Sequence, residues 1–548
     1  MRRWLVLLVL VATSATAGAR DLVIGTTQYP STLHPNIDSM AAKSYVHGLT
    51  QRPLTTFDAS WELVCMLCTE LPTFENGLAV RTPTPSGRDG VKLTYTLQPG
   101  ASWGDGVPVT TKDVLFTWEV GKHPASGVGN AEMYRRILAI EPTDDKTFVM
   151  LVDRISFNYN AINDFRLLPA HLERPVFERD PATYRNRTRF DTEPGNPGLA
   201  FGPYRIADVT PGSRIRLERN PTWWGPQPAF ETITVRTIES SPALEANLLS
   251  GELDMIEGSL GLALDQALAF EKRHGAKYRV HYQPGLVYEH IDLYLDNPIL
   301  ADRRVRRALL MGLDREVLVG QLFGGRQPVA DTSVHPLDWV HAKDLPRATH
   351  DPAGAAALLA EAGWLPGPGG TRRNGQGVPL QLELMTTAGN RTRELVQQVL
   401  QSMWKKLGID VAIRNEPARV LFGETLSKRR FTGMVMFAWI SSPENVPRST
   451  LSSTEIPSEQ NGWSGQNYTG YSNARVDELV EEIEVELDRE RRRGLWRELQ
   501  QIYADELPAL PLYFRADPHI WPRWLEGIVP TGHQAPVTLW VESWRVTD

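Results

Sequence analysis

The chain has 548 residues, of which 41% are hydrophobic and 22% are charged, and its 65 Asp and Glu outnumber its 58 Lys and Arg. At about 100 to 200 residues per domain, this length predicts two to four domains, each with a core of its own. The net charge of −7 argues against nucleic acid as a partner, because nucleic-acid-binding proteins carry an excess of basic residues.

The N-terminus has the three parts of a secretory signal peptide. Two arginines precede an apolar run over residues 4–12, and small residues follow it. The run is much shorter than the roughly 20 residues that a membrane-spanning helix needs. We therefore expect residues 1–19 to be a signal peptide, cleaved after Ala17 or Ala19, and the mature protein to reach the periplasm. An uncleaved N-terminal anchor is the alternative.

The chain contains only two cysteines, Cys65 and Cys68. In an oxidising compartment a local disulfide is the leading interpretation, although the spacing permits the bond without ensuring its geometry. A structural zinc site would need four ligands, and no second Cys pair or close His pair completes them. We therefore expect no metal site.

Strands and capped helices alternate along the rest of the chain, which predicts a mixed α/β fold. Alternating apolar residues predict strands at 92–97, 146–152, 233–238 and 409–413. Cap residues and helical spacing predict helices that begin at Thr110, Asp351 and Asn473, one that carries Leu395, Val399, Met403 and Leu407 on one face, and one over 491–506.

The sequence lacks the common signatures of catalysis. No phosphate-binding Gly-rich loop, nucleophile elbow or His-Glu-x-x-His motif occurs. The 12 histidines are scattered, and such isolated residues are more often structural than catalytic. The basic segments 303–307 and 489–493 are expected to be solvated helix faces. We therefore expect a binding protein without a cofactor.

Several longer strings occur in an order that points to one family. The longest is WGDGVPVTTKDVLFTW at 103–118. The others are FGPYRI at 201–206, LERNP at 217–221, LSGELD at 249–254, DRRVRRAL at 302–309, NYTGYSN at 467–473 and LPLY at 510–513. Together they closely resemble the family 5 extracellular solute-binding proteins over nearly the whole mature chain.

That resemblance implies a type II periplasmic binding protein fold, with two lobes that close on a ligand and one inserted lobe. Transferred to this chain, lobe I comprises 20–50, 201–283 and 512–548, lobe II comprises 51–200, and lobe III comprises 284–511. Hinges are expected near 282–292 and 507–515. The implied partners are a peptide or small solute and the permease subunits of an ABC importer in the inner membrane. We expect the protein itself to be a monomer.

The same resemblance places the ligand between lobes I and III. The candidate ligand-binding residues are Tyr29, Tyr288, Glu289, His290, Trp439, Ser441, Ser442, Glu444, Tyr513 and Arg515. Trp439 is the first choice, because in similar proteins a Trp at this strand end lines the pocket. Each of these residues could equally serve in core or hinge packing.

The segment after Trp439 departs from the peptide-binding pattern. In similar proteins an acidic residue follows this Trp and pairs with the amino group of the peptide, whereas here Ser441 and Ser442 stand in its place. A buried ammonium without an anion is costly, so either Glu444 takes the role or the ligand has no free amino terminus. We expect peptide import, with binding of a sugar, opine or metal chelate as the alternative, and a periplasmic enzyme or chaperone as a third.

Overall fold

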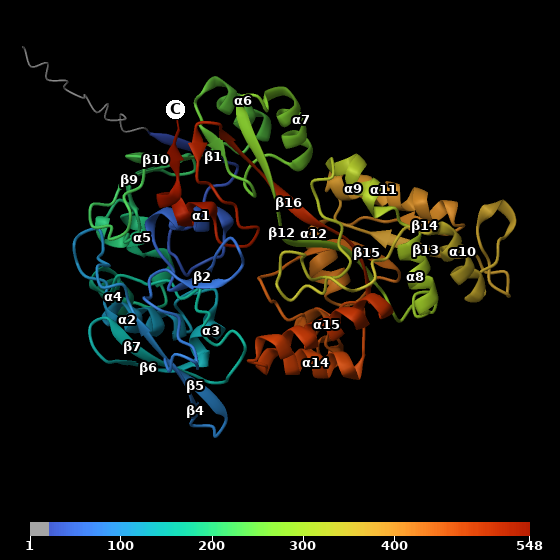
Figure 1. Ribbon diagram of the computed structural model, residues 1–548, viewed down its shortest axis with the longest axis horizontal. Helices are drawn as coiled ribbons and strands as arrows, with labels where there is room; N and C mark the ends of the chain where they lie inside the picture. Colours follow the sequence, from blue (N-terminus) through green and yellow to red (C-terminus); the bar gives the residue numbers. More distant parts are fainter. Residues whose placement is uncertain (1–20, 548) are drawn as a thin grey trace, which may run out of the picture.

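The computed structural model describes residues 21–547, so the expected signal peptide and its cleavage points lie outside the described residues. Figure 1 shows two bodies joined by two long strands. The elements of the first body fall within 22–274 and 525–546, and those of the second within 303–506. None of the helices within residues 21–547 combines the length and the apolar composition that crossing a membrane requires.

One sheet of ten strands extends through both bodies, in the order β14-β13-β15-β12-β16-β11-β1-β10-β9-β8. In that order the strands are β14 (Asp410–Ile413), β13 (Gln381–Met385), β15 (Met434–Ile440), β12 (Tyr278–Leu293), β16 (Ala509–Pro522), β11 (Met255–Ile256), β1 (Leu22–Thr26), β10 (Thr232–Thr237), β9 (Arg214–Arg219) and β8 (Tyr204–Thr210). The first body has a parallel group, in which β1 pairs with β10 and β11. The second body has another, in which β13 pairs with β14 and β15.

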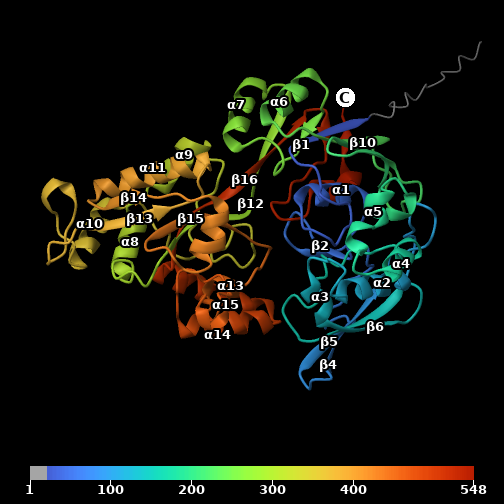
Figure 2. The ribbon, with the colours of Figure 1, turned by 180° about the vertical axis from the view of Figure 1, so that it is seen from behind.

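The two long strands, β12 and β16, cross between the bodies side by side, as Figures 1 and 2 show. They pair antiparallel along two stretches, 278–284 with 516–522 and 288–292 with 509–514. The register shifts between Pro284 and Tyr288, where the ladder is interrupted. An interruption of this kind removes ladder hydrogen bonds and bends the strand, so the crossing has its weakest resistance to bending there.

Helices cover both faces of the sheet in the first body. On one face α6 (Ser241–Ser250) packs Leu244 and Leu248, and α7 (Leu264–His274) packs Phe270, in one core with Ile520 of β16. On the other face α1 (Ala41–Thr50) and η7 (Val537–Ser543) enclose Tyr45 and Trp521 in a second core. Successive residues of a strand point to opposite faces, so Ile520 and Trp521 belong to different cores.

A separate antiparallel sheet lies at the far end of the first body, in the order β4-β5-β7-β6. Its strands are β4 (Ala79–Pro83), β5 (Asp89–Thr96), β7 (Thr147–Val152) and β6 (Ile137–Pro142), and its helices are α2 (Thr111–Lys122), α3 (Ala131–Arg136) and α4 (Ala170–Arg179). The sheet has a core of its own, built around Trp103, Tyr95 and Phe148. The family-like string at 103–118 therefore serves the packing of this unit, with Thr110 and Asp113 forming a capping box at the start of α2.

The second body surrounds its half of the sheet with helices. These are α8 (Arg303–Met311), α9 (Arg315–Phe323), α10 (Pro352–Glu361), α11 (Arg391–Lys406), α14 (Ala474–Val485) and α15 (Arg489–Glu506), with the short α12 (Ala418–Val420) and α13 (Arg448–Leu451) between them. Leu309, Leu400 and Trp404 lie in its main core together with Met436 of β15. A smaller core joins α14 and α15 around Leu479 and Trp496.

The structure confirms the four predicted strands, as β5, β7, β10 and β14, and the predicted helices, as α2, α10, α11, α14 and α15. The predicted face of α11 lies at the border of the core. Val396, Leu400 and Trp404 are the most deeply buried residues of the helix, and of the predicted face Leu407 is buried, Val399 and Met403 pack against the core, and Leu395 is 41% exposed. The basic segments were also only partly solvated, because Arg306 is buried against backbone carbonyls and Arg492 is buried beside Glu444.

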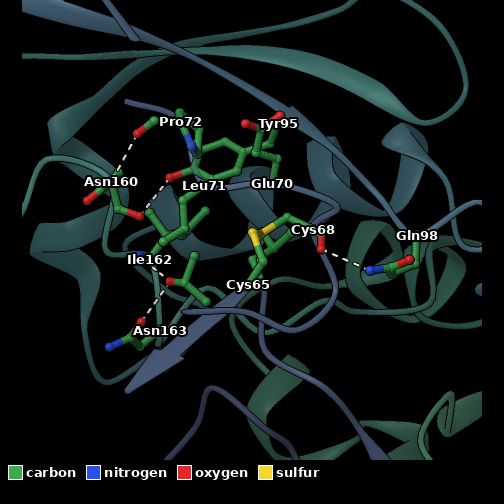
Figure 3. The surroundings of a disulfide bond; sticks show 12 residues. Cys65, Cys68, Glu70, Leu71, Pro72, Tyr95, Gln98, Asn160, Ile162 and Asn163 are labelled. Carbon is green, nitrogen blue, oxygen red and sulfur yellow. Dashed lines mark hydrogen bonds between the residues drawn. A yellow bond between two sulfur atoms is a disulfide. The ribbon is translucent and has the colours of Figure 1, made fainter. Parts of the chain in front are cut away.

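Cys65 and Cys68 form a disulfide at the end of β3 (Leu63–Cys65), which pairs with β2 (Thr55–Phe57). The two Cα atoms are 5.1 Å apart. Figure 3 shows the bond between the loops that carry Gln98 and Asn160, and the side chain of Gln98 donates to the backbone carbonyl of Cys68. The bond therefore fixes the edge of the core of the inserted unit.

Candidate functional site

The carboxyl ends of the parallel strands define where a ligand is expected. In α/β sheets ligands bind in the crevice outside these ends. β1 and β11 end at Thr26 and Ile256 in the first body, and β13 and β15 end at Met385 and Ile440 in the second. The candidate site therefore comprises the residues just beyond these ends and the crossing strands between them.

In the first body, the segments that follow β1 and β11 are joined directly. The backbone N–H and the hydroxyl of Thr27 both donate to the carbonyl of Leu260, at 2.7 and 2.8 Å. Tyr29 follows closely and packs, half-buried, against the core that contains Tyr45. Burial, and then the charge of Asp191, raises the pKa of the Tyr29 hydroxyl, so this group is a neutral hydrogen-bonding partner.

In the second body, Trp439 belongs to an aromatic cluster near the end of β15. Its ring centroid lies 5.1 Å from that of Phe437, 5.9 Å from that of Tyr468 and 6.2 Å from that of His290. Trp439 remains half-buried, so it can offer a ring edge or face to a ligand.

The two serines that follow β15 differ in their surroundings. The backbone N–H of Ser441 donates to the carbonyl of Leu286 in β12 at 3.3 Å, which ties the end of β15 to the crossing. Ser442, by contrast, is exposed. Its hydroxyl is therefore within reach of solvent or of a ligand.

Three of the candidate residues are packed inside the crossing. The Tyr288 hydroxyl lies 3.0 Å from the Tyr503 hydroxyl, and the Tyr288 ring stacks on His290 at 5.0 Å. Tyr513 packs against Phe323, with ring centroids 5.0 Å apart. Tyr288, His290 and Tyr513 are all buried, and their contacts stabilise the second body next to the hinge.

Glu289 forms a charged cluster with two arginines. Its carboxylate, 1% exposed, accepts from the guanidinium of Arg393 at 3.1 to 3.3 Å and from that of Arg515. Burial alone would raise the pKa of Glu289, but the charges of Arg515 and Arg393 outweigh it and hold the pKa below its ordinary value. One carboxylate faces two guanidiniums, so the cluster carries an excess positive charge.

Glu444 is held by neighbouring side chains. One carboxylate oxygen lies 3.1 Å from Arg492 Nη2, and the other accepts from the indole N–H of Trp339. Its backbone N–H donates to Asp338 Oδ2 at 2.8 Å. A ligand ammonium would have to compete with Arg492 for this carboxylate, which weighs against Glu444 as a free anionic clamp.

The sequence analysis missed three charged residues of this region, namely Arg393, Glu257 and Asp517. Arg393 begins α11 on its buried face and binds Glu289 and the Thr387 hydroxyl, the latter at 3.2 Å. Asp517 lies within a strand, where Asp is disfavoured, and this is a signal that sequence alone could have supplied. Glu257 directly follows a two-residue strand and carried no comparable signal.

The two bodies also touch outside the crossing strands. The rings of Trp61 and His335 are 5.0 Å apart, and Glu62 Oε1 lies 2.6 Å from Arg489 Nη2. The backbone N–H of Phe157 donates to the Glu484 carbonyl at 2.9 Å. Within residues 21–547, no group of three or more His, Cys, Asp or Glu side chains could hold a metal ion.

Two α/β bodies that share one sheet, with two crossing strands between their parallel groups, define a two-lobed solute-binding protein of the type II class. Residues 73–458 match the model of the "Bacterial extracellular solute-binding proteins, family 5 Middle". The match spans more than half of the chain, so the chain belongs to this family, whose members are extracellular or periplasmic binding proteins.

Similar proteins of known type cover nearly the full length of the chain. The oligopeptide-binding protein AppA of Bacillus subtilis is 26% identical over 512 residues, which is 92% of this chain and 88% of AppA. The oligopeptide-binding protein of Thermus thermophilus, solved with a pentapeptide, is 31% identical with a TM-score of 0.67, over 94% of this chain and 95% of that one. NikA of Brucella suis, solved with Fe(III)-EDTA, has a TM-score of 0.77 over 96% of this chain and 100% of that one, and at 19% identity it shows the fold alone.

Proposed function

We propose that this protein captures peptides in the periplasm and delivers them to the permease subunits of an ABC importer. The observation that carries the proposal is membership of family 5 together with the 31% identity to a pentapeptide-binding protein over nearly the whole chain. The architecture permits domain closure, because two bodies that are linked by two strands can close around a solute.

The crossing strands suggest the boundaries of the lobes. We assign lobe I to 20–50, 201–283 and 512–548, lobe II to 51–200 and lobe III to 284–511. The boundary at 283/284 is supported by the interrupted pairing after Pro284. The separate hydrophobic cores of the first body, the inserted sheet and the second body support three units.

Closure is favoured when a ligand contacts both lobes, since only differential binding shifts the equilibrium between open and closed forms. The contacts of Trp61, Glu62 and Phe157 with His335, Arg489 and Glu484 are those expected of a closed form. The closed protein then presents a distinct surface to the permease.

Within the site we assign direct ligand contacts to Tyr29, Trp439, Ser441, Ser442 and Arg515. An aromatic ring, hydroxyls and a guanidinium suit a peptide, whose main chain needs hydrogen bonds and whose side chains need apolar surface. The buried Tyr288, Glu289, His290 and Tyr513 position these residues, and Glu444 fixes the loop after β15 through Arg492.

An anionic solute such as a metal chelate is the second candidate. It is favoured by one observation, the excess of two guanidiniums over one carboxylate around Glu289. A bound anion would balance that charge, and Arg515 remains 38% exposed for the purpose.

Two measurements test the function. Native mass spectrometry of the freshly purified protein should show a bound peptide mass that is lost on unfolding. A mixture of tetrapeptides should raise the melting temperature, because binding at a hundredfold excess over Kd stabilises the folded form by about 2.7 kcal/mol. If only EDTA-type chelates raise the melting temperature, the second candidate replaces the first.

A further inference from the structure

Asp517 is a carboxylate at the crossing without a hydrogen-bond donor among residues 21–547. It lies on β16 opposite Gln283 of β12, two residues after Arg515. The side chain is partly buried. Burial raises the pKa of Asp517 against the opposing charge of Arg515, so its charge is poorly compensated within the protein.

A second carboxylate, Glu257, stands beside it at the carboxyl end of β11. The residue before it, Ile256, pairs with Ile520 of β16, and the residue after it, Gly258, lies directly against the His519 ring. Glu257 is 5% exposed and accepts from the Leu260 N–H at 2.7 Å and from the Ser259 hydroxyl at 3.3 Å. Both bonds end on Oε2, so Oε1 keeps capacity for a further donor.

Buried polar atoms around the two carboxylates also lack partners. Alternation along β16 puts Asp517, His519 and Trp521 on the face that packs toward α1, which carries Tyr45. The Tyr45 hydroxyl and His519 Nδ1 are buried without a hydrogen bond among residues 21–547. The charge of Glu257 contributes to the raised pKa of Tyr45, after the larger effect of burial, which places the hydroxyl near that carboxylate.

Such a set of groups indicates an occupant from outside the chain. Buried polar groups are almost always satisfied, and leaving several unpaired in one place is costly. Two carboxylates favour a cation over a water molecule. An ammonium group carries three donors and one positive charge, which matches two carboxylates and a neighbouring hydroxyl.

We propose that Asp517 and Glu257 form the subsite for the protonated amino group of the ligand. The inference rests on the proposed peptide function and deepens it, because it selects peptides with a free amino terminus. It also explains why serines can stand at 441 and 442. The carboxylates that bind the amino group lie on the crossing strand and in lobe I, so none is needed after β15 in lobe III. At about 3.3 Å per residue, Arg515 begins about 7 Å from Asp517 and can meet a carbonyl or carboxylate of the same ligand.

The test compares a mixture of tetrapeptides that have free amino termini with the same mixture after N-acetylation, by titration calorimetry. We expect wild type to bind the free mixture at least about tenfold more tightly. Asp517→Asn and Glu257→Gln should each weaken binding of the free mixture by about thirtyfold or more and leave binding of the acetylated mixture nearly unchanged. Only the free peptides carry an ammonium group whose desolvated charge pair the substitutions remove. Asp517→Asn should also fold normally, because it removes a carboxylate that no donor within residues 21–547 holds.

Matched variants separate the possible outcomes. Asp208→Asn removes an exposed carboxylate on β8, paired with Arg214, and should leave binding of both mixtures unchanged. Equal binding of the two mixtures by wild type, or an unchanged preference in Asp517→Asn and Glu257→Gln, would overturn the subsite while the peptide function stands. Binding of neither mixture would overturn the peptide function and the subsite with it.

Discussion

Arg489 in α15 and Glu62 after β2 form an ion pair of 2.6 Å that joins the two bodies outside the crossing strands. Both side chains are about half exposed, so the pair is worth roughly 1 kcal/mol or less. It therefore biases closure without fixing it.

Arg489→Ala should open the protein slightly. Loss of the pair should weaken ligand binding by about fivefold at most, and the difference from wild type should shrink at high salt. Small-angle scattering without ligand should show a larger radius of gyration. Arg493→Ala is the control, because Arg493 pairs with Glu490 inside the same helix. Identical scattering of the two variants would exclude a role of the Glu62 contact in closure.

Glu289→Gln should be strongly destabilising. The substitution leaves Arg393 and Arg515 next to each other without the buried carboxylate that both bind, and breaking a buried pair in this way costs about 3–5 kcal/mol. Urea unfolding measures the change. Glu424→Gln, which removes a carboxylate from an exposed pair with Lys428, should shift the free energy of unfolding by less than about 0.5 kcal/mol.

Stability should fall as the pH rises from about 4.5 to 7, in part because of Glu257. Burial raises the pKa of Glu257 from 4.5 to about 7, so over this range the folded protein keeps a proton that the unfolded chain releases. The contribution is fully present below pH 4.5, and roughly 3 kcal/mol of it is lost by pH 8. Urea unfolding of wild type and Glu257→Gln at a series of pH values isolates this part. If the free energies of unfolding of the two proteins change with pH in parallel, the raised pKa of Glu257 is refuted as a cause.

Glu444→Gln should lower stability without changing the preference for free over acetylated peptides. The carboxylate neutralises the buried Arg492, which would otherwise be left without its anion. A variant that folds normally but binds both peptide mixtures equally would restore Glu444 as the amino clamp. Thermal melting measures the stability of the variant, and calorimetric titration with the free and the acetylated peptide mixtures measures its preference.

Replacing Cys65 and Cys68 by serine should cost about 2 kcal/mol at most, because the closed loop is short. Peptide affinity should not change, since the two cysteines belong to the core built around Trp103 and Tyr95 and touch none of the candidate ligand-binding residues in an observed contact. Thermal melting under oxidising conditions, followed by calorimetry, measures both effects. Reduced affinity in a folded double variant would implicate this unit in binding.

The elements were largely predictable from sequence because their signals are local. Thr110 with Asp113, Asp351 with Pro352, and Asn473 begin helices through contacts within a few residues. The depth of burial along α11 was not predictable in the same way. Leu395 and Val396 are both apolar, and only the position of the sheet decides that Val396 is covered and Leu395 is exposed.

The site was predicted less well for the same physical reason. The resemblance to the family suggested Trp439 and Arg515 as ligand contacts, and these assignments stay predictions. The ionic partners depend on long-range contacts. Glu289 meets Arg393 across 104 residues, and Glu444 meets Arg492 across 48. No spacing rule connects residues that far apart, and the strands that place Glu257 and Asp517, β11 and β16, are adjacent only in the folded sheet.

The chain path also sets the order in which the protein can assemble after export. Residues 278–522 form the crossing and the second body as one continuous segment, whereas the first body needs the last residues of the chain. Thr538 donates to the carbonyl of Tyr45 at 2.7 Å, and Glu542 lies 2.7 Å from Arg52, so α1 packs against residues that lie about 490 positions later in the sequence. A chain that emerges N-terminus first therefore completes its second body before its first, and truncation of the final dozen residues should leave an assembled second body attached to an unfinished first one.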